Sequence, residues 1–157
     1  MENDIDFNLN RTEFSSEKEL EEYLLSMSLY YGTKMNEIEN YIYKLHDENR
    51  ENQEIDYFPE FRKLYLPVFE AFATDKKRVY GGKASSFGFP SKYDGIENYI
   101  ESSVTIKNKN RAEIYFKTNN NFDAEYLFVL IRKNNLWRID NIKYRWYNDK
   151  KWSPTIM

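Results

Sequence analysis

The chain has 157 residues, of which 41% are hydrophobic, and it contains 14 Tyr and 11 Phe. A chain of this length is typical of one domain with a substantial core, and its aromatic content excludes a disordered chain. The absence of Cys excludes disulfide bonds and thiolate chemistry. The net charge of −3 is divided unevenly. Residues 1–60 hold 16 acidic and 5 basic side chains, whereas residues 61–157 hold 10 acidic and 18 basic ones.

Nothing in the sequence predicts export or insertion into a membrane. Residues 1–6 lack the basic and apolar blocks of a signal peptide. The apolar runs are also shorter than the roughly 18 residues that a membrane-spanning helix requires. We therefore expect a cytoplasmic protein that has no membrane partner.

Two helices are predicted over residues 16–31 and 34–50. Ser16 followed by Glu19 forms a capping box, and apolar residues then recur at helical spacing up to Gly32, which favours a helix end. A second capping box follows, formed by Asn36 and Glu39.

A third helix is predicted over residues 59–74, because Pro59 suits a first helical position. Pro67 lies inside this stretch and is expected to bend it. The residues before the first helix, 1–14, are expected to form a polar lead-in that packs through Ile5, Phe7 and Leu9.

The C-terminal third predicts three long strands of a curved antiparallel sheet. The first strand, 104–117, is interrupted by polar residues 107–110, and the second is the apolar run 126–131. Asn134-Asn135 suits a two-residue hairpin turn before the third strand. The apolar phase of that strand slips near Asp140-Asn141, which predicts a β-bulge. The expected organisation is one domain, 1–157, with a lead-in over 1–14, a helical layer over 15–75 and a sheet over 79–152.

Several short motifs over roughly residues 60–152 resemble a known family. They are Thr74-Asp75-Lys76-Lys77-Arg78-Val79-Tyr80-Gly81-Gly82, Ser86-Phe87-Gly88-Phe89-Pro90 with Tyr93-Asp94, Tyr126-Leu127-Phe128-Val129-Leu130, and Trp137-Arg138-Ile139-Asp140 with Lys143-Tyr144 and Trp152. The chain is similar to immunity proteins of the nuclear transport factor 2-like fold, which occur in bacterial polymorphic toxin systems.

The resemblance implies both a fold and a function. The implied fold is α+β and cone-shaped, with three N-terminal helices packed on a strongly curved, mostly antiparallel sheet. The implied function is not enzymatic: the protein would bind a cognate toxin domain and occlude its active surface, as an inhibitor in bacterial competition. Members of the family share the scaffold but not one binding surface, so the resemblance assigns no partner-contact residues.

The residues themselves suggest two candidate partner-binding groups. The acidic run could act as a decoy for a basic, nucleic-acid-cleaving toxin, since charge complementarity speeds association and selects partners. The alternative is a solvated helix end. Trp146 and Trp152 are of a type enriched at interface hot spots, although the same type also packs cores. The acidic candidates are Asp47, Glu48, Glu51, Glu54 and Asp56.

A second hypothesis is a small-ligand-binding or enzymatic pocket between helices and sheet. Asp140 could act as a general base beside Tyr144 or Tyr115. The alternative is that Asp140 pairs with Arg138 or Arg145 or caps the bulge. The candidate pocket-lining residues are Phe89, Tyr115, Trp137, Asp140 and Tyr144.

Other ligands are not expected from the sequence. The single His46 has no second histidine at metal-ligating spacing, so no metal or other cofactor is expected. The basic side chains are interleaved with acidic ones and the isoelectric point is about 5.4, which argues against a nucleic-acid partner. A homodimer through an open sheet face remains a third alternative.

Overall fold

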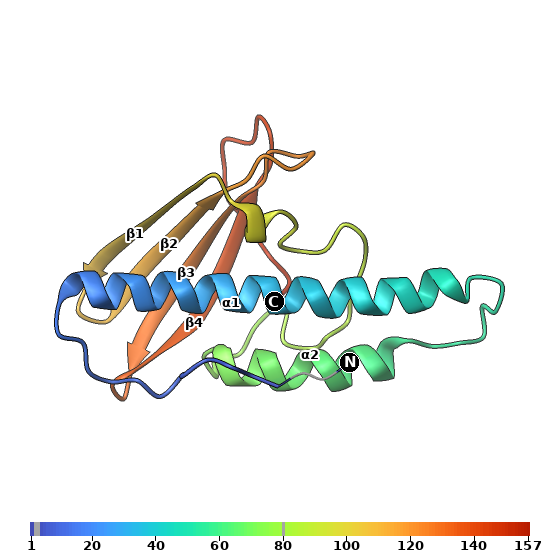
Figure 1. Ribbon diagram of the computed structural model, residues 1–157, viewed down its shortest axis with the longest axis horizontal. Coiled ribbons are helices and arrows are strands. Elements are labelled where there is room, and N and C mark those ends of the chain that lie inside the picture. Colours follow the sequence, from blue (N-terminus) through green and yellow to red (C-terminus); the bar gives the residue numbers. More distant parts are fainter. Residues whose placement is uncertain (2–3, 80) are drawn as a thin grey trace.

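The computed structural model describes residues 1, 4–79 and 81–157, so residues 2–3 of the lead-in and Tyr80 of the family-like motif lie outside the described residues. The elements are α1 (Glu17–Glu48), α2 (Phe58–Phe72), the 3-10 helix η1 (Ile96–Asn98), β1 (Glu101–Asn108), β2 (Arg111–Lys117), β3 (Glu125–Lys133), β4 (Leu136–Arg145) and β5 (Ser153–Pro154). Figure 1 shows α1 crossing one face of the sheet, with α2 lying beside α1. The α+β class is therefore confirmed.

The described residues contain two α-helices rather than three, because the first two predicted helices are one continuous helix, α1. Gly32 is not a helix end: it lies within α1, where an added Cβ would stand 2.9 Å from Cδ1 of Ile96. Asn36 and Glu39 do not cap a second helix, since both are buried in α1 and bind another segment. The first cap is correct, because the Ser16 side chain accepts a hydrogen bond from Glu19 N.

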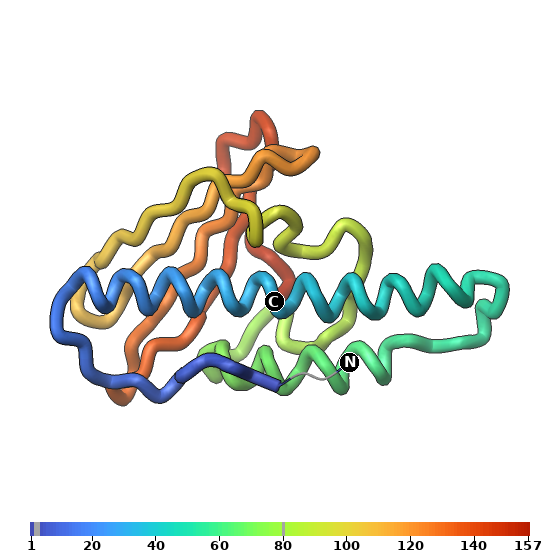
Figure 2. Tube along the Cα trace, in the orientation of Figure 1, coloured from blue at the N-terminus to red at the C-terminus, as the bar shows by residue number. Residues whose placement is uncertain are grey.

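Helix α2 returns antiparallel to α1 and keeps Pro67 within its span. The lead-in runs back along the helical layer (Figure 2). Ile5, Phe7 and Leu9 are partly buried against the core, as expected, and the Phe7 ring lies 5.4 Å from that of Tyr23. The two helices and the lead-in together form one layer.

The second layer is a five-stranded antiparallel sheet in the order β1-β2-β3-β4-β5. The predicted first strand is two strands, because β1 and β2 form a hairpin that turns at Lys109-Asn110. Asn134 and Asn135 have φ of 54° and 63°, which confirms the predicted hairpin turn between β3 and β4. The sheet is twisted but not strongly curled, contrary to expectation (Figure 1).

The predicted bulge in β4 is confirmed and keeps the strand's apolar side chains on the inner face. Pairing with β3 shifts by one residue, so that Val129 faces Asn141 whereas Leu130 faces Ile139. Asp140 is the extra residue. Side chains on both sides of the bulge therefore pack into the core: Trp137 is 2% exposed, and Ile139 and Ile142 are fully buried.

Candidate functional site

A pocket of about 610 Å³ opens where three loop segments meet at one end of the sheet. These segments are the loop before η1, the β2–β3 connection and the residues from the end of β4 to the chain end. Figures 1 and 2 show the β2–β3 and β4–β5 connections meeting at the top of the molecule. We call this the loop-end pocket and define it by Asp94, Asn120, Phe122, Tyr126, Tyr144 and Trp146.

Asn120 fixes the polar wall of the loop-end pocket. Its Nδ2 donates to the Asp94 carbonyl at 2.9 Å and lies 3.2 Å from Asp94 Oδ2, while its Oδ1 accepts from Ala124 N at 2.9 Å. The Tyr126 hydroxyl donates to the same Asp94 carbonyl at 2.7 Å. Two loops distant in sequence are thereby held together, which places the Asp94 carboxyl group at a defined point of the pocket wall.

Another part of the pocket lining is an aromatic stack at the surface. The Phe122 and Trp146 rings lie 4.8 Å apart with 21° between their planes, and Tyr144 lies 5.5 Å from Trp146. Trp146 is 46% exposed and Phe122 is 39% exposed. Hydrogen bonds hold the backbone beneath them, from Tyr147 N to Phe122 O at 2.8 Å and from Trp146 N to Asp149 Oδ2 at 2.9 Å. Exposed aromatic groups on a fixed backbone are typical of binding surfaces.

Buried polar groups of α1 hold the loop that forms the third side. The Asn36 side chain pairs with the Tyr93 backbone, donating to its carbonyl at 2.7 Å and accepting from its N–H at 3.0 Å. Glu39 accepts from Lys92 N at 2.8 Å and forms an ion pair with the Lys92 ammonium. Burial raises the pKa of the Glu39 carboxyl group, against the opposing effect of Lys92.

Neither Asn36 nor Glu39 was identified from the sequence as a positioning residue. The sequence does place both residues among the apolar positions of α1. The apolar neighbours Met35, Ile38 and Ile42 are all 0–1% exposed in the structure. Polar groups in such a stripe require partners, and here the partners lie more than 50 residues further along the chain.

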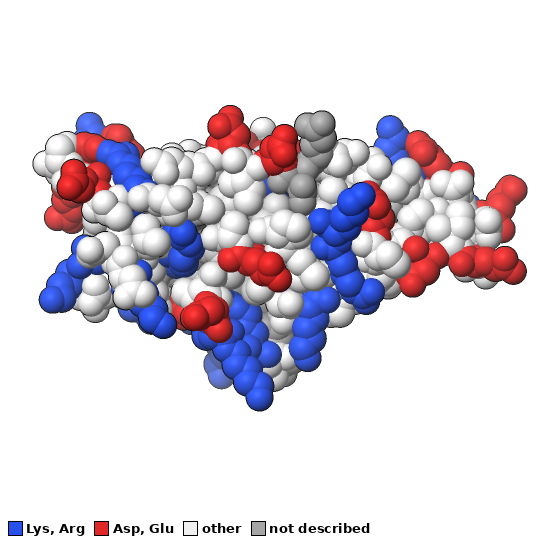
Figure 3. Space-filling view, turned by 90° about the horizontal axis from the view of Figure 1, so that it is seen from below, with Lys and Arg blue, Asp and Glu red and all other residues white. Residues whose placement is uncertain are grey.

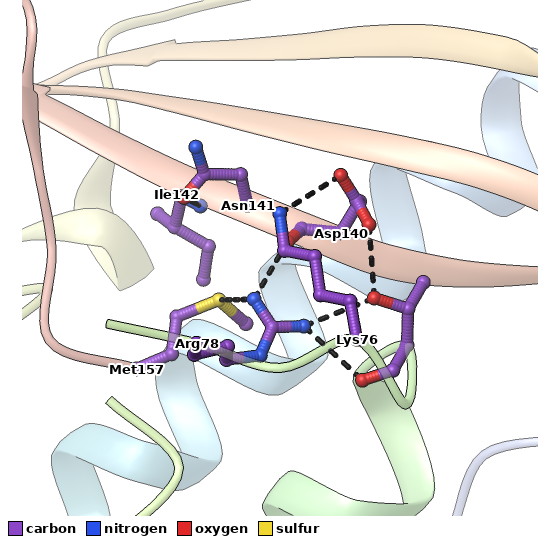
Figure 4. A network of polar contacts seen from close by, with 7 residues as sticks. Lys76, Arg78, Asp140, Asn141, Ile142 and Met157 are labelled. Atoms are coloured by element: carbon purple, nitrogen blue, oxygen red, sulfur yellow. Dashed lines mark hydrogen bonds and ion pairs between the residues drawn. The ribbon is translucent and has the colours of Figure 1, made fainter. Parts of the chain in front are cut away.

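Asp140, the candidate general base, is held in a structural network at the β4 bulge (Figure 4). Its carboxylate accepts from Thr74 Oγ1 at 2.9 Å and from Lys76 Nζ at 3.0 Å. Arg78 donates to the Asp140 carbonyl at 2.6 Å. The network ties the segment after α2 to the edge of β4, and Asp140 does not line the loop-end pocket.

The expected arginine partners of Asp140 are wrong. Among the described residues, Arg138 donates to the Leu9 carbonyl at 2.7 Å, and Arg145 pairs with Glu125 at 2.6 Å. The partner of Asp140 is Lys76, from the connection that follows α2.

The five predicted pocket residues do not form one pocket. Tyr144 lines the loop-end pocket, whereas Trp137 is buried in the core. Phe89 is 68% exposed and stacks on Tyr43 of α1 at 5.1 Å. Tyr115 donates to Glu125.

Tyr115 belongs to a cluster with Trp152 and the Glu125–Arg145 ion pair. Arg145 lies 4.3 Å above the Trp152 ring, and Tyr115 meets that ring at 6.3 Å. The Arg145 guanidinium lowers the pKa of Glu125, while burial and Glu125 raise the pKa of Tyr115 to about 12. Trp152 and Trp146 therefore occupy different surroundings.

This cluster predicts a pH-dependent contribution to stability. The folded-state pKa of Glu125 lies below its usual 4.5, so its ion pair stabilises the fold above pH 4.5 and this contribution is lost as the pH falls through the lowered pKa. Glu125→Gln should therefore be less stable than the parent at pH 7, by an amount that shrinks toward pH 3. Urea unfolding at several pH values measures the difference. A difference that is constant with pH would contradict the assignment.

The acidic candidates lie together at the far end of the helical layer, away from the loop-end pocket. Asp47, Glu48, Glu51, Glu54 and Asp56 are all exposed, and together they form what we call the acidic tip. Figure 3 shows acidic side chains gathered at the right-hand end of the molecule, with lysines and arginines over the broader part of the same face. Two members have local cationic partners, since Asp47 pairs with Arg50 and Glu48 lies 4.0 Å from Lys44.

The described residues contain neither a metal centre nor a membrane-spanning helix. Within residues 4–79 and 81–157, no three His, Asp or Glu side chains are grouped as a metal centre. None of the helices in the same ranges combines the length and apolarity that crossing a membrane requires.

Comparison with known protein families shows to which family the chain is similar. The model of a family described as NTF2 fold immunity protein, where NTF2 denotes nuclear transport factor 2, matches residues 23–155. Neither the curated proteins nor the solved structures gave a match. The matched range includes most of α1, all of α2, the whole sheet and all residues that line the loop-end pocket except Ile156.

Proposed function

Because the chain belongs to the NTF2 fold immunity protein family, we propose that it binds a cognate toxin domain and neutralises it by covering the toxin's active surface. The observation that carries the proposed binding site is the exposed Phe122–Trp146 stack beside the loop-end pocket. The proposed action is stoichiometric binding rather than catalysis. Asp140, a candidate base predicted from the sequence, supports this view because Thr74 and Lys76 engage its carboxylate.

The loop-end pocket suits the centre of a protein interface. Stable interfaces bury roughly 1,200–2,000 Å² in total, with a few aromatic anchors near the centre supplying most of the binding energy. The hydrogen bonds of Asn120 and Tyr126 hold the pocket walls before a partner arrives. Preorganisation of this kind lowers the entropy cost of association.

The acidic tip is proposed to attract a basic toxin rather than to anchor it. Reversing the charges of Glu48, Glu51 and Glu54 to Lys should slow association roughly tenfold or more at low salt, because complementary charge mainly raises the association rate. Stopped-flow association at several salt concentrations measures this effect, with Glu13, Glu17 and Glu21 reversed as a control of equal charge change. An unchanged rate and salt dependence would remove the tip from the proposal.

Co-expression tests the proposed function itself. The toxin to use is the one encoded beside the gene for this chain, produced in a sensitive host with and without the chain. Rescue of growth together with a complex in size-exclusion chromatography is the expected result. If growth is not rescued and no complex forms, the immunity proposal is wrong.

A further inference from the structure

We propose that the loop-end pocket receives a cationic side chain of the toxin, an arginine or a lysine, between the aromatic stack and the Asp94 carboxylate. This inference rests on the proposed function and adds the chemistry of the partner at the site.

The aromatic wall offers the groups that recognise organic cations. Tryptophan is the strongest cation–π partner among the side chains, and a cation within about 6 Å of a ring centroid is attracted to its face. Trp146 is flanked by Phe122 and Tyr144 at 4.8 and 5.5 Å. The chain already makes contacts of this kind elsewhere, because Arg145 lies 4.3 Å from the Trp152 centroid and Arg11 lies 4.6 Å from that of Phe14.

The charges around the pocket leave one carboxylate for a partner. Asp94 makes no ion pair with any lysine, arginine or histidine of residues 4–79 and 81–157. Lys92, also at the pocket, is already engaged by Glu39 and by the Ser86 carbonyl at 2.7 Å. The negative charge of Asp94 is therefore not neutralised within the described part of the chain.

The position of Asp94 is set by groups that do not neutralise it. Its main-chain carbonyl accepts hydrogen bonds from Asn120 Nδ2 and from the Tyr126 hydroxyl. The side chain of Asn120, which carries no charge, also donates to Asp94 Oδ2 at 3.2 Å. Oδ1 has no hydrogen-bond donor within the described residues, so it can accept from an incoming guanidinium or ammonium group. A volume of about 610 Å³ is sufficient for a long side chain together with its bound water.

Uncharged and anionic occupants fit less well. A purely apolar group would cover the Asp94 carboxylate without pairing it, and burying an unpaired charge is costly. An anionic group would be repelled by the same carboxylate. The acidic tip, at another part of the surface, independently favours a basic partner.

A small-molecule probe separates this inference from the immunity proposal. Nα-acetyl-argininamide is titrated into the full chain, and Nα-acetyl-citrullinamide, its uncharged counterpart of nearly the same shape, is the control ligand. Nitrogen–proton correlation spectra follow the Trp146 indole, which is assigned by its loss in Trp146→Leu. The argininamide should shift this signal saturably at millimolar concentration, and the citrulline compound should bind roughly tenfold more weakly.

Two variants complete the test. Asp94→Asn, which keeps the shape and the oxygen facing Asn120, should weaken argininamide binding roughly tenfold, whereas Glu101→Gln, an equal loss of charge on β1, should leave it unchanged. Equal binding of the two ligands, no binding of either, or an unchanged affinity in Asp94→Asn would overturn the inference. Growth rescue by the parent chain would still support the immunity proposal in each case.

Discussion

Glu39→Gln is expected to lower the free energy of unfolding by about 3–5 kcal/mol, the usual cost of removing one partner of a buried ion pair. The Glu39 side chain is 2% exposed and that of Lys92 is 16% exposed. The substitution leaves the Lys92 ammonium without its counter-charge, close to the rings of Phe61 and Tyr65 at 5.6 Å. Urea unfolding measures the loss, with the exposed Glu37→Gln, two residues away on α1, as the matched control.

Replacing Glu39 and Lys92 together is expected to lower the free energy of unfolding less than replacing either residue alone. The raised pKa of Glu39 means that burial disfavours its charge more than Lys92 favours it. Replacing both residues by Met should therefore recover much of the stability that either single substitution loses. A Glu39→Gln loss below about 1 kcal/mol, or strictly additive Met substitutions, would contradict the proposed role of the pair in fixing the loop.

Trp146→Ala is expected to weaken toxin binding by about 2–4 kcal/mol, roughly 30- to 1,000-fold, the range of aromatic hot spots. Most of the change should appear in the dissociation rate. Stability should change little, because the ring is 46% exposed. Surface plasmon resonance with the cognate toxin domain measures both rates.

Trp152→Ala is the matched control for this prediction, since it removes the same side chain from the Tyr115–Arg145 cluster. Trp146 and Trp152 are both candidate partner contacts predicted from the sequence, with core packing as the alternative, and the structure places them in different surroundings. If Trp152→Ala weakens binding as much as Trp146→Ala, or more, the binding surface extends over that cluster and the loop-end pocket is not its centre.

The sequence predicts this fold best where local rules decide the structure. The slip of apolar phase at Asp140 marks the bulge because side chains alternate along a strand. Asn134-Asn135 marks a turn because asparagine tolerates positive φ. The helix end predicted at Gly32 is wrong, because a glycine also suits a position where another segment packs closely against a helix, as Ile96 does here.

The site was less predictable, because its residues come together only through the tertiary fold. Asp94 and Asn120 are 26 positions apart, and nothing local in either loop indicates that they bind each other. Asn36 and Glu39 show the spacing of a helix cap, yet their partners are Tyr93 and Lys92. The acidic tip was visible in the sequence because it is a contiguous exposed segment, and its role remains a prediction.

If the chain acts by occupying a toxin surface, as we propose, neutralisation of the toxin must be stoichiometric. A fixed amount of the cognate toxin domain is titrated with the chain, and the remaining toxin activity is measured. We expect toxin activity to fall linearly and to reach zero near one equivalent. Complete loss of toxin activity at a small fraction of an equivalent would show turnover, and the chain would then not act by binding alone.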